Sequence, residues 1–214
     1  MLAGDNSMVK YPNGNRKEFH TDPDTLKKSN QPTFSRRGMT LEEEINESNE
    51  YYLVNNQAVI YKKPTPIQIV SVDYPKRSRA VIKEAYFRQA STTDYNGVYR
   101  GYYVDFEAKE TKNKLSFPLK NFHQHQIEHF KRCLLQDGIC FVIIKFSTMN
   151  RYFVTPASLI IANFEHDDDQ KSIKLTTIEE ASIELSIGYR PTIPYLDAVD
   201  QLIKNKGIKT NNDR

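Results

Sequence analysis

The segment Ile139–Phe146, with the sequence ICFVIIKF, is the feature that most constrains how this chain folds. A nearly continuous apolar run of this length is typical of a central strand that is covered on both faces. A helix is predicted in front of it, at about 121–136, and Asp137-Gly138 closes that helix. Helices and strands are mixed along the rest of the chain, which indicates an α/β fold.

The composition excludes several classes of protein. The 214 residues fit one domain with a substantial core, which the 13 Tyr and 11 Phe make aromatic. Apolar runs stay below the roughly 18 residues of a membrane span, and the N-terminus lacks the apolar stretch of a secretory signal. Two cysteines, Cys133 and Cys140, allow neither a disulfide framework nor a four-cysteine zinc site. We therefore expect a soluble, cytoplasmic protein with no membrane partner.

The two ends of the chain differ from its centre. Residues 1–37 are polar and aperiodic and carry several cations, among them Arg37, so we expect a flexible basic arm able to contact a polyanion. Residues 205–214 are expected to form a disordered tail. A folded domain is therefore predicted at 38–204.

Local signals place the elements of that domain. Thr40 with Glu43 forms a capping-box pattern, which predicts the start of a helix. This helix is expected to end near Asn55-Asn56. A last amphipathic helix is predicted to include Leu196. Asn96-Gly97 is predicted to be a turn. The predicted strands, besides the central one, lie at 58–61, 67–74, 80–87, 98–103, 104–109 and 152–154.

The segments 67–74 and 80–87 are predicted to pair as a long hairpin with a basic tip that includes Lys76 and Arg77. The net charge of the whole chain is only +3, but Tyr61–Arg88 holds seven basic and two acidic residues, with aromatic side chains between them. Cations that meet phosphates and flat rings that stack on bases together suit a nucleic-acid surface. On charge alone, a solvated hairpin is the simpler alternative.

Three residues after the hairpin have the types and spacing of a metal site. Glu107 and Lys109 lie two apart on a predicted strand and so project from one face, and Asp94 precedes Glu107 by thirteen positions. Two carboxylates can hold Mg²⁺ through oxygen atoms, and an ammonium beside the ion can stabilise charge on a phosphoryl oxygen. A local ion pair at a strand end is the alternative, because this pattern alone is weak.

The predicted helix at 121–136 adds a candidate to this site. Gln126 falls near the middle of its apolar face, among Ile127 and Phe130, where its amide needs a partner. A helix packed on the sheet would direct Gln126 toward the metal, although a core Gln bonded to backbone is as good an explanation. Thr92 lies on the same side as Asp94 and is the fourth oxygen candidate.

A competing motif lies on the same helix. His125-Gln126-Ile127-Glu128-His129 reads H-x-x-E-H, which is a signature of zinc metallopeptidases. A third protein ligand is needed downstream, and Glu179 or Glu180 are candidates without supporting context. This interpretation leaves Asp94, Glu107 and the basic hairpin unexplained.

Several segments together resemble the RecU Holliday junction resolvases, over about residues 36–195 and in the same order. They are RGM at 37–39, KKPTP at 62–66, YPKRS at 74–78, STTDYNG at 91–97, DFEAKETK at 105–112 and HQIEH at 125–129. The resemblance implies a restriction-endonuclease-like α/β fold, with a mixed central sheet flanked by helices and a protruding β-hairpin stalk at 67–87.

The resemblance also implies the activity and the residues that serve it. Members are dimeric, metal-dependent endonucleases that act on four-way DNA junctions in recombination. The family's acids match Asp94 and Glu107, its lysine matches Lys109, and its further metal positions match Thr92 and Gln126. Contacts with DNA are implied for Lys62, Arg77, Tyr86 and Phe87.

The sequence thus predicts a Holliday junction resolvase that nicks opposite strands symmetrically as a homodimer, with Mg²⁺ as cofactor and Mn²⁺ as a possible substitute. A nucleoid-associated location and a recombinase or branch-migration helicase as partner are expected with that function. The alternative function, which is not that of an enzyme, is a non-catalytic scaffold that binds junctions or anneals strands.

Overall fold

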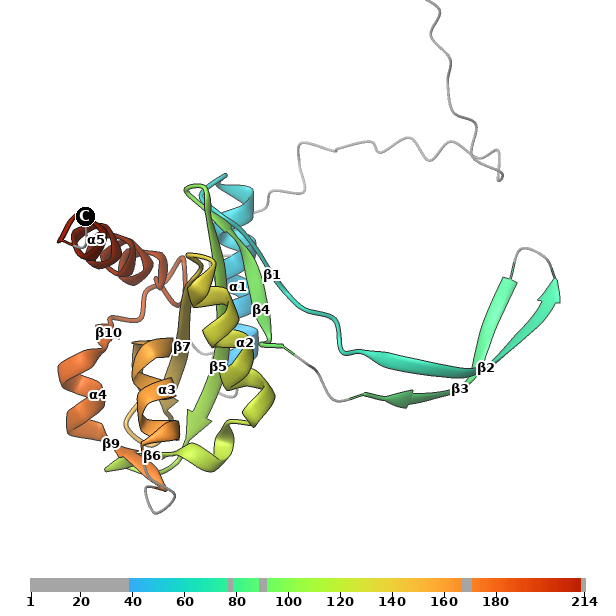
Figure 1. Ribbon diagram of the computed structural model, residues 1–214. Helices are drawn as coiled ribbons and strands as arrows, with labels where there is room; N and C mark the ends of the chain where they lie inside the picture. Colours follow the sequence, from blue (N-terminus) through green and yellow to red (C-terminus); the bar gives the residue numbers. More distant parts are fainter. Residues whose placement is uncertain (1–38, 77–78, 89–91, 167–170, 213–214) are drawn as a thin grey trace, which may run out of the picture. The chain divides into compact units, whose positions relative to one another are not determined.

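A six-stranded mixed sheet organises the computed structural model, which describes residues 39–76, 79–88, 92–166 and 171–212 (Figure 1). The predicted basic arm with Arg37, and also Arg77, lie outside the described residues. In spatial order the strands are β1 (Val59–Lys62), β4 (Tyr95–Tyr99), β5 (Tyr102–Thr111), β7 (Ile139–Phe146), β8 (Arg151–Pro156) and β10 (Ile183–Leu185). Only the β5–β7 pair among them is parallel.

The prediction of a doubly covered central strand is confirmed by β7, in which every residue is buried. Ile139, Phe141 and Ile143 point into one hydrophobic core. Cys140, Val142 and Ile144 point into a second core on the other face of the sheet. The near absence of polar positions in this strand follows from burial on both faces.

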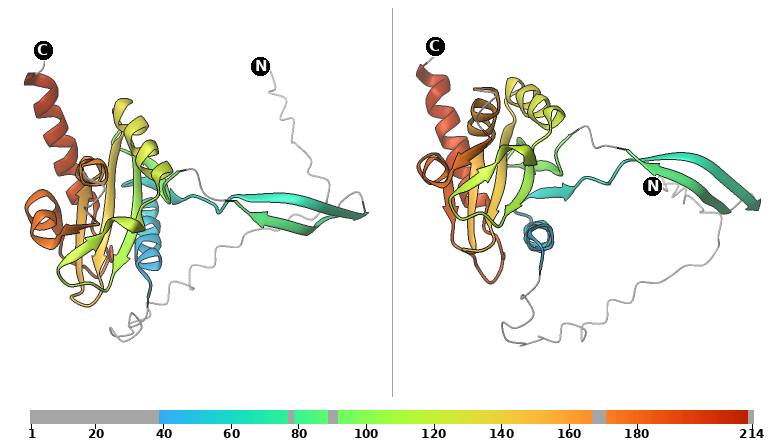
Figure 2. Two further views of the ribbon diagram at one scale, coloured as in Figure 1. Left: turned by 60° about the horizontal axis from the view of Figure 1, so that its bottom comes forward. Right: turned by 90° about the horizontal axis from the view of Figure 1, so that it is seen from below.

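Helices cover both faces of the sheet (Figure 2). The first core is closed by α1 (Leu41–Val54) and α5 (Leu196–Asn212). The second is closed by α2 (Gln124–Leu135), α3 (Ala157–Glu165) and α4 (Leu175–Ala181). Two small elements complete it, a sheet of β6 (Ser116–Pro118) with β9 (Ser172–Lys174) and the short helix η2 (Leu119–Asn121). This is the mixed, helix-flanked sheet that the sequence predicts.

The start of α1 is fixed by the predicted capping box. The Glu43 side chain accepts the Thr40 N–H at 2.7 Å, and the Thr40 hydroxyl oxygen accepts the Glu43 N–H at 3.3 Å. Two backbone N–H groups that the first helical turn leaves without partners are thereby satisfied.

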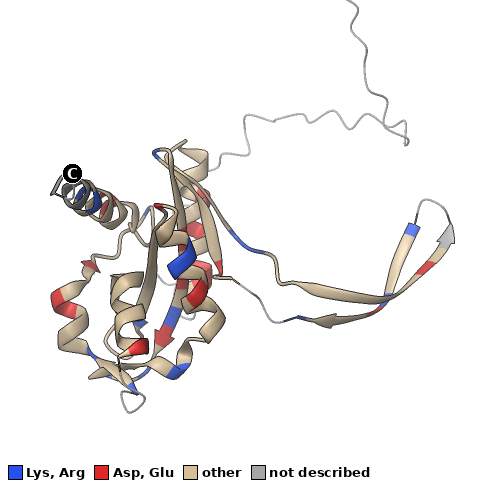
Figure 3. Ribbon diagram, in the orientation of Figure 1, with Lys and Arg blue, Asp and Glu red and all other residues tan. Residues whose placement is uncertain are grey.

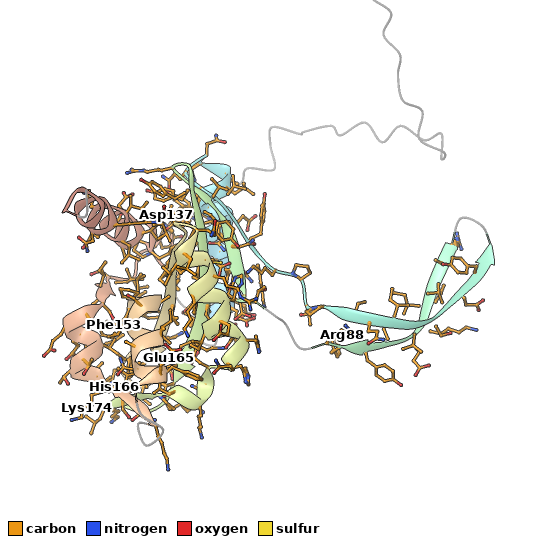
Figure 4. All side chains as sticks on the ribbon, viewed as in Figure 1. Arg88, Asp137, Phe153, Glu165, His166 and Lys174 are labelled. Carbon is orange, nitrogen blue, oxygen red and sulfur yellow. The ribbon has the colours of Figure 1, made fainter. Side chains whose placement is uncertain are left out.

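The predicted hairpin forms a two-stranded sheet of its own from β2 (Ile67–Lys76) and β3 (Arg79–Phe87). Every residue of β3 is exposed, including apolar and aromatic side chains that Figure 4 shows along the strands. At the base of the hairpin the N–H of Arg88 donates to the Pro66 carbonyl at 2.9 Å. Large exposed apolar side chains on a hairpin are unusual in a protein that has no partner.

Two local predictions need correction. Asn96-Gly97 is not a turn, because both residues lie inside β4, and the chain reverses at Arg100-Gly101 with positive φ angles of 49° and 81°. A Cβ on Gly97 would lie 2.0 Å from the carbonyl oxygen of Val59. Glycine is therefore needed here for close contact between β1 and β4, which the dipeptide rule does not detect.

The C-terminal helix also runs further than predicted. Although the sequence suggests a disordered tail at 205–214, α5 continues to Asn212. Lys206 contributes to this extension because its ammonium pairs with the Asp137 carboxylate at 2.9 Å. Within the described residues, no helix is both long and apolar enough to cross a membrane.

A buried ion pair lies on the α1 side of β7. The Lys145 ammonium donates to Glu44 Oε2 at 3.0 Å, and the Tyr152 hydroxyl donates to the same carboxylate. Lys145 and Glu44 retain only 8% and 9% of their exposure. Such a pair adds little by itself, but removal of one partner leaves an uncompensated charge in the core.

We therefore expect Lys145→Met to lower the free energy of unfolding by about 3–5 kcal/mol, while the double variant Lys145→Met/Glu44→Gln recovers most of that loss. Urea denaturation of the three proteins at one pH measures the difference. Equal stability of the single variant and the parent would contradict the assignment of a buried charge pair.

Candidate active site

Strand β5 places acidic and basic side chains on the sheet face beneath α2. Its residues Val104 and Phe106 point into the α1 core, so Asp105, Glu107 and Lys109 point the other way. Glu107 is 1% exposed, and the Lys109 ammonium donates to its Oε1 at 2.7 Å. Figure 3 shows residues of both signs close together along β5 and α2.

Gln126 reaches the same carboxylate from the buried face of α2. Its side-chain amide nitrogen donates to Glu107 Oε1 at 2.7 Å. Its carbonyl oxygen accepts the N–H of His123, the N-cap residue, at 3.1 Å. The amide nitrogen therefore faces Glu107, while the oxygen that a cation would bind faces the helix terminus.

The predicted acid Asp94 lies directly before β4, next to Glu107. The Asp94 N–H donates to Glu107 Oε2 at 3.1 Å, and the side chain is half-buried. Thr92 is also half-buried, but its hydroxyl donates to the Thr93 carbonyl oxygen at 3.4 Å. The structure thus brings Asp94, Glu107, Lys109 and Gln126 together, whereas Thr92 is near the group only through its position in the chain.

The electrostatics of Glu107 suit a cation site. Burial, against the opposing effect of the Lys109 ammonium and with a further contribution from the nearby Asp94 carboxylate, raises the pKa of the Glu107 carboxyl to about 7. A second carboxylate beside a buried one disfavours ionisation of the buried group, and a hard divalent cation relieves that repulsion through oxygen ligands. The two carboxylates fit a hard divalent cation such as Mg²⁺ or Mn²⁺, while the Gln126 oxygen accepts from His123 and the Thr92 hydroxyl donates to Thr93.

A second buried carboxylate, Asp105, was missed by the sequence analysis. It is fully buried, and its Oδ2 accepts from the Lys63 ammonium at 2.9 Å and the Tyr103 hydroxyl at 2.8 Å. Thr93 donates to its Oδ1, and His129 Nε2 lies 3.1 Å from Oδ2. The sequence contained a signal for it, since Asp105 shares the two-residue period of Glu107 and Lys109 and has apolar or aromatic residues on both sides in the strand.

Asp105 also belongs to a group with the spacing of metal ligands. The ligand atoms of Asp105, His129 and Cys133 lie within 4.8 Å of one another. Lys63, however, already supplies the positive charge that compensates Asp105. A cation at this point would have to displace the ammonium, so the group is better explained as a buried network.

The zinc-peptidase motif does not assemble in the structure. His129 faces Asp105, while His125 stacks on His123 with ring centroids 5.4 Å apart. Glu128 is on the exposed side of α2, where it accepts from Gln124. The candidate third ligand Glu179 is engaged by Arg151 at 2.6 Å.

The predicted DNA-contacting residues are distributed over the hairpin and its base. Lys62 pairs with Glu42 at the surface. Tyr86 is 59% exposed, and its hydroxyl donates to Glu84 at 2.6 Å. Phe87 is 83% exposed. Lys76 lies at the end of β2. An aromatic side chain as exposed as Phe87 is available to stack on a base.

A buried acid beside a second acid and a lysine, on a helix-flanked mixed sheet, has the chemistry of a hydrolase that uses a divalent cation. The family model described as "Recombination protein U" matches residues 36–201, and the chain therefore belongs to the RecU family. Membership confirms the resemblance drawn from the motifs.

Curated relatives cover nearly the whole chain. "Holliday junction resolvase RecU" of Lactobacillus acidophilus is 59% identical over 209 residues, which covers 93% of this chain and 99% of the relative. The protein of the same name from Lactiplantibacillus plantarum is 60% identical over 201 residues, which covers 91% and 96%. The solved structure of Archaeoglobus fulgidus Hjc, a Holliday junction resolvase, is similar with a TM-score of 0.39 and 10% identity, covering 67% of this chain and 93% of that one.

The raised pKa of Glu107 predicts a pH-dependent cost to stability. Because the folded state keeps this proton up to about pH 7 and the unfolded state loses it near the ordinary glutamate pKa of 4.5, stability falls as pH rises through that interval. Glu107→Gln removes the titration. In EDTA we expect the variant to match the parent near pH 5 and to exceed its stability at pH 8 by up to about 3 kcal/mol.

Denaturant melts of both proteins at the two pH values test this expectation. A variant that is less stable than the parent at pH 8 would show that the bonds from Lys109 and Gln126 to the carboxylate outweigh its burial.

Proposed function

We propose that this protein is a Holliday junction resolvase, a structure-specific endonuclease that cuts four-way DNA junctions with the help of Mg²⁺ or Mn²⁺. The observation that carries the proposal is the convergence of Asp94, Lys109 and Gln126 on the buried Glu107. Membership of the RecU family supports four-way junction DNA as the substrate, because the relatives are named as Holliday junction resolvases.

Asp94 and Glu107 would hold the cation. Gln126 and Thr92 would be further ligands, and Gln126 would have to turn its side-chain oxygen from the His123 N–H toward the ion. When bound, the ion supplies Lewis-acid stabilisation to a phosphoryl oxygen and makes a water molecule easier to deprotonate. Lys109 lies within hydrogen-bond distance of Glu107, so its ammonium is placed to orient the attacking water or to stabilise negative charge as water adds to phosphorus and one P–O ester bond breaks.

The hairpin would recognise the junction. Its exposed Tyr86 and Phe87 are suited to stack on bases at the branch point, and the cations would contact phosphates. These cations are Arg37, Lys62, Lys76 and Arg77.

A homodimer would present two sites to a junction that is itself nearly two-fold, and so would nick opposite strands. A protein with this function would work in the cytoplasm with the nucleoid, and a recombinase or a branch-migration helicase would be a fitting partner. The alternative, a scaffold that binds junctions without cutting them, is decided by the experiments below.

Asp94→Asn is expected to abolish cutting and to leave junction binding intact, because the change removes one charged ligand and keeps the shape of the side chain. The parent should nick a labelled four-way junction symmetrically in Mg²⁺ or Mn²⁺, with little cutting in EDTA or of a matched linear duplex. Glu50→Gln, on the exposed side of α1, is the control for loss of a carboxylate.

Tight junction binding by the parent with no cutting in any of these metals would favour the scaffold. Neither binding nor cutting would remove the proposal.

Phe87→Ala is expected to weaken junction binding on the order of tenfold, since a base–aromatic stack contributes about 1–3 kcal/mol. Stability should stay within about 0.5 kcal/mol, because the side chain is 83% exposed. Leu135→Ala is the matched control, at 80% exposure and outside the hairpin. Fluorescence anisotropy with a labelled junction measures the dissociation constants, and equal values for parent and Phe87→Ala would remove the stacking role.

A further inference from the structure

Two adjacent lysines at the end of β1 have different surroundings. Lys62 faces outward and pairs with the exposed Glu42. Lys63 faces inward, where its ammonium donates to Asp105 Oδ2 and to the Thr93 hydroxyl oxygen, each at 2.9 Å. The second lysine is therefore engaged inside the protein and is poorly placed to contact a phosphate.

The carboxylate of Asp105, which pairs with Lys63, needs this positive charge because of its depth in the protein. Asp105 is fully buried, and an unpaired charge at that depth would strongly destabilise the fold. Its other contacts come from Thr93, Tyr103 and His129, so the network joins the end of β1, the segment before β4, β5 and α2.

This network lies next to the proposed metal ligand Asp94. Thr93, which is 1% exposed, immediately precedes Asp94. The backbone N–H of Lys63 donates to the Asp94 carbonyl oxygen at 2.7 Å, while the Asp94 N–H donates to Glu107. Residues 92–94 lie before the first residue of β4, and the Lys63–Asp94 bond extends the β1–β4 pairing by one residue. This bond, the contact with Glu107 and the side-chain network around Thr93 together hold the backbone that carries the Asp94 carboxylate.

We propose that Lys63, Asp105 and Thr93 form a clamp that positions Asp94 beside Glu107 for cation binding. They are positioning residues, because Asp105 and Thr93 are buried and the Lys63 ammonium is engaged by both of them. This inference rests on the proposed function, in which Asp94 and Glu107 hold the cation. It adds that the affinity of the site depends on a charge pair outside the ligand set.

The test uses the double variant Lys63→Met/Asp105→Asn, since either single change would leave a buried charge without a partner and endanger folding. Binding of Mn²⁺ is measured from the free-ion electron paramagnetic resonance signal, and exchange of the Asp94 amide hydrogen is measured by NMR in EDTA. The control is Lys145→Met/Glu44→Gln, which removes a buried Lys–carboxylate pair from the opposite face of the sheet.

We expect the Lys63/Asp105 double variant to bind Mn²⁺ at least tenfold more weakly and to exchange the Asp94 amide at least tenfold faster than the parent. Its junction binding in EDTA should stay within twofold. The control variant should match the parent in Mn²⁺ affinity and in Asp94 exchange.

A folded double variant with parental Mn²⁺ affinity and parental Asp94 exchange would overturn the clamp. Equal effects in the control variant would also overturn it, because the role would then be general stability. If the parent itself bound no Mn²⁺, the proposed function would fail, and the exchange rates alone would still decide whether Lys63 and Asp105 hold the Asp94 backbone.

Discussion

The parallel pairing of β5 with β7 is the constraint on which the rest of the molecule depends. It sets Asp105 opposite Cys140 and Glu107 opposite Val142, in the centre of a sheet that is covered on both faces. Since side chains alternate along a strand, one face of β5 serves the α1 core with Val104 and Phe106, and the other face carries charge under α2. The same pairing therefore builds the core and encloses the candidate site.

Charge in such a position has to be compensated, and the compensation differs along the strand. Asp105 accepts hydrogen bonds from a lysine and from several further donors. Glu107 also accepts from a lysine, but burial and the nearby Asp94 carboxylate together raise its pKa. In the proposed function this contrast gives two buried acids only two residues apart different tasks, since Asp105 would secure the backbone and Glu107 would bind the cation.

Features that depend on local chemistry could be predicted from the sequence. The capping box at Thr40, the buried strand Ile139–Phe146 and the inward position of Gln126 are of this kind, because helix and strand periods are visible in one segment. The site candidates Asp94 and Glu107 were predicted because both are acidic residues near a lysine, and the family motifs supported the prediction.

Features that depend on neighbouring strands could not be predicted in this way. Asn96-Gly97 was interpreted as a turn, but glycine is needed at position 97 because Val59 of another strand lies in close contact with it. Lys63 resembled its neighbour Lys62 in the sequence, and only the placement of Asp105 across the sheet separates the two. The residues that support a site are harder to recognise in a sequence than its ligands, because they form no motif with a characteristic spacing.

The base of the hairpin has a consequence for how this molecule can change. The chain leaves at Pro66 and returns at Arg88, and a backbone hydrogen bond joins the two points. A segment whose ends meet in this way is an insertion, so its length can vary without shifting the register of the sheet. Descendants of one nuclease can thus acquire longer, shorter or altered arms for differently shaped nucleic acids while the hydrolytic centre stays as it is.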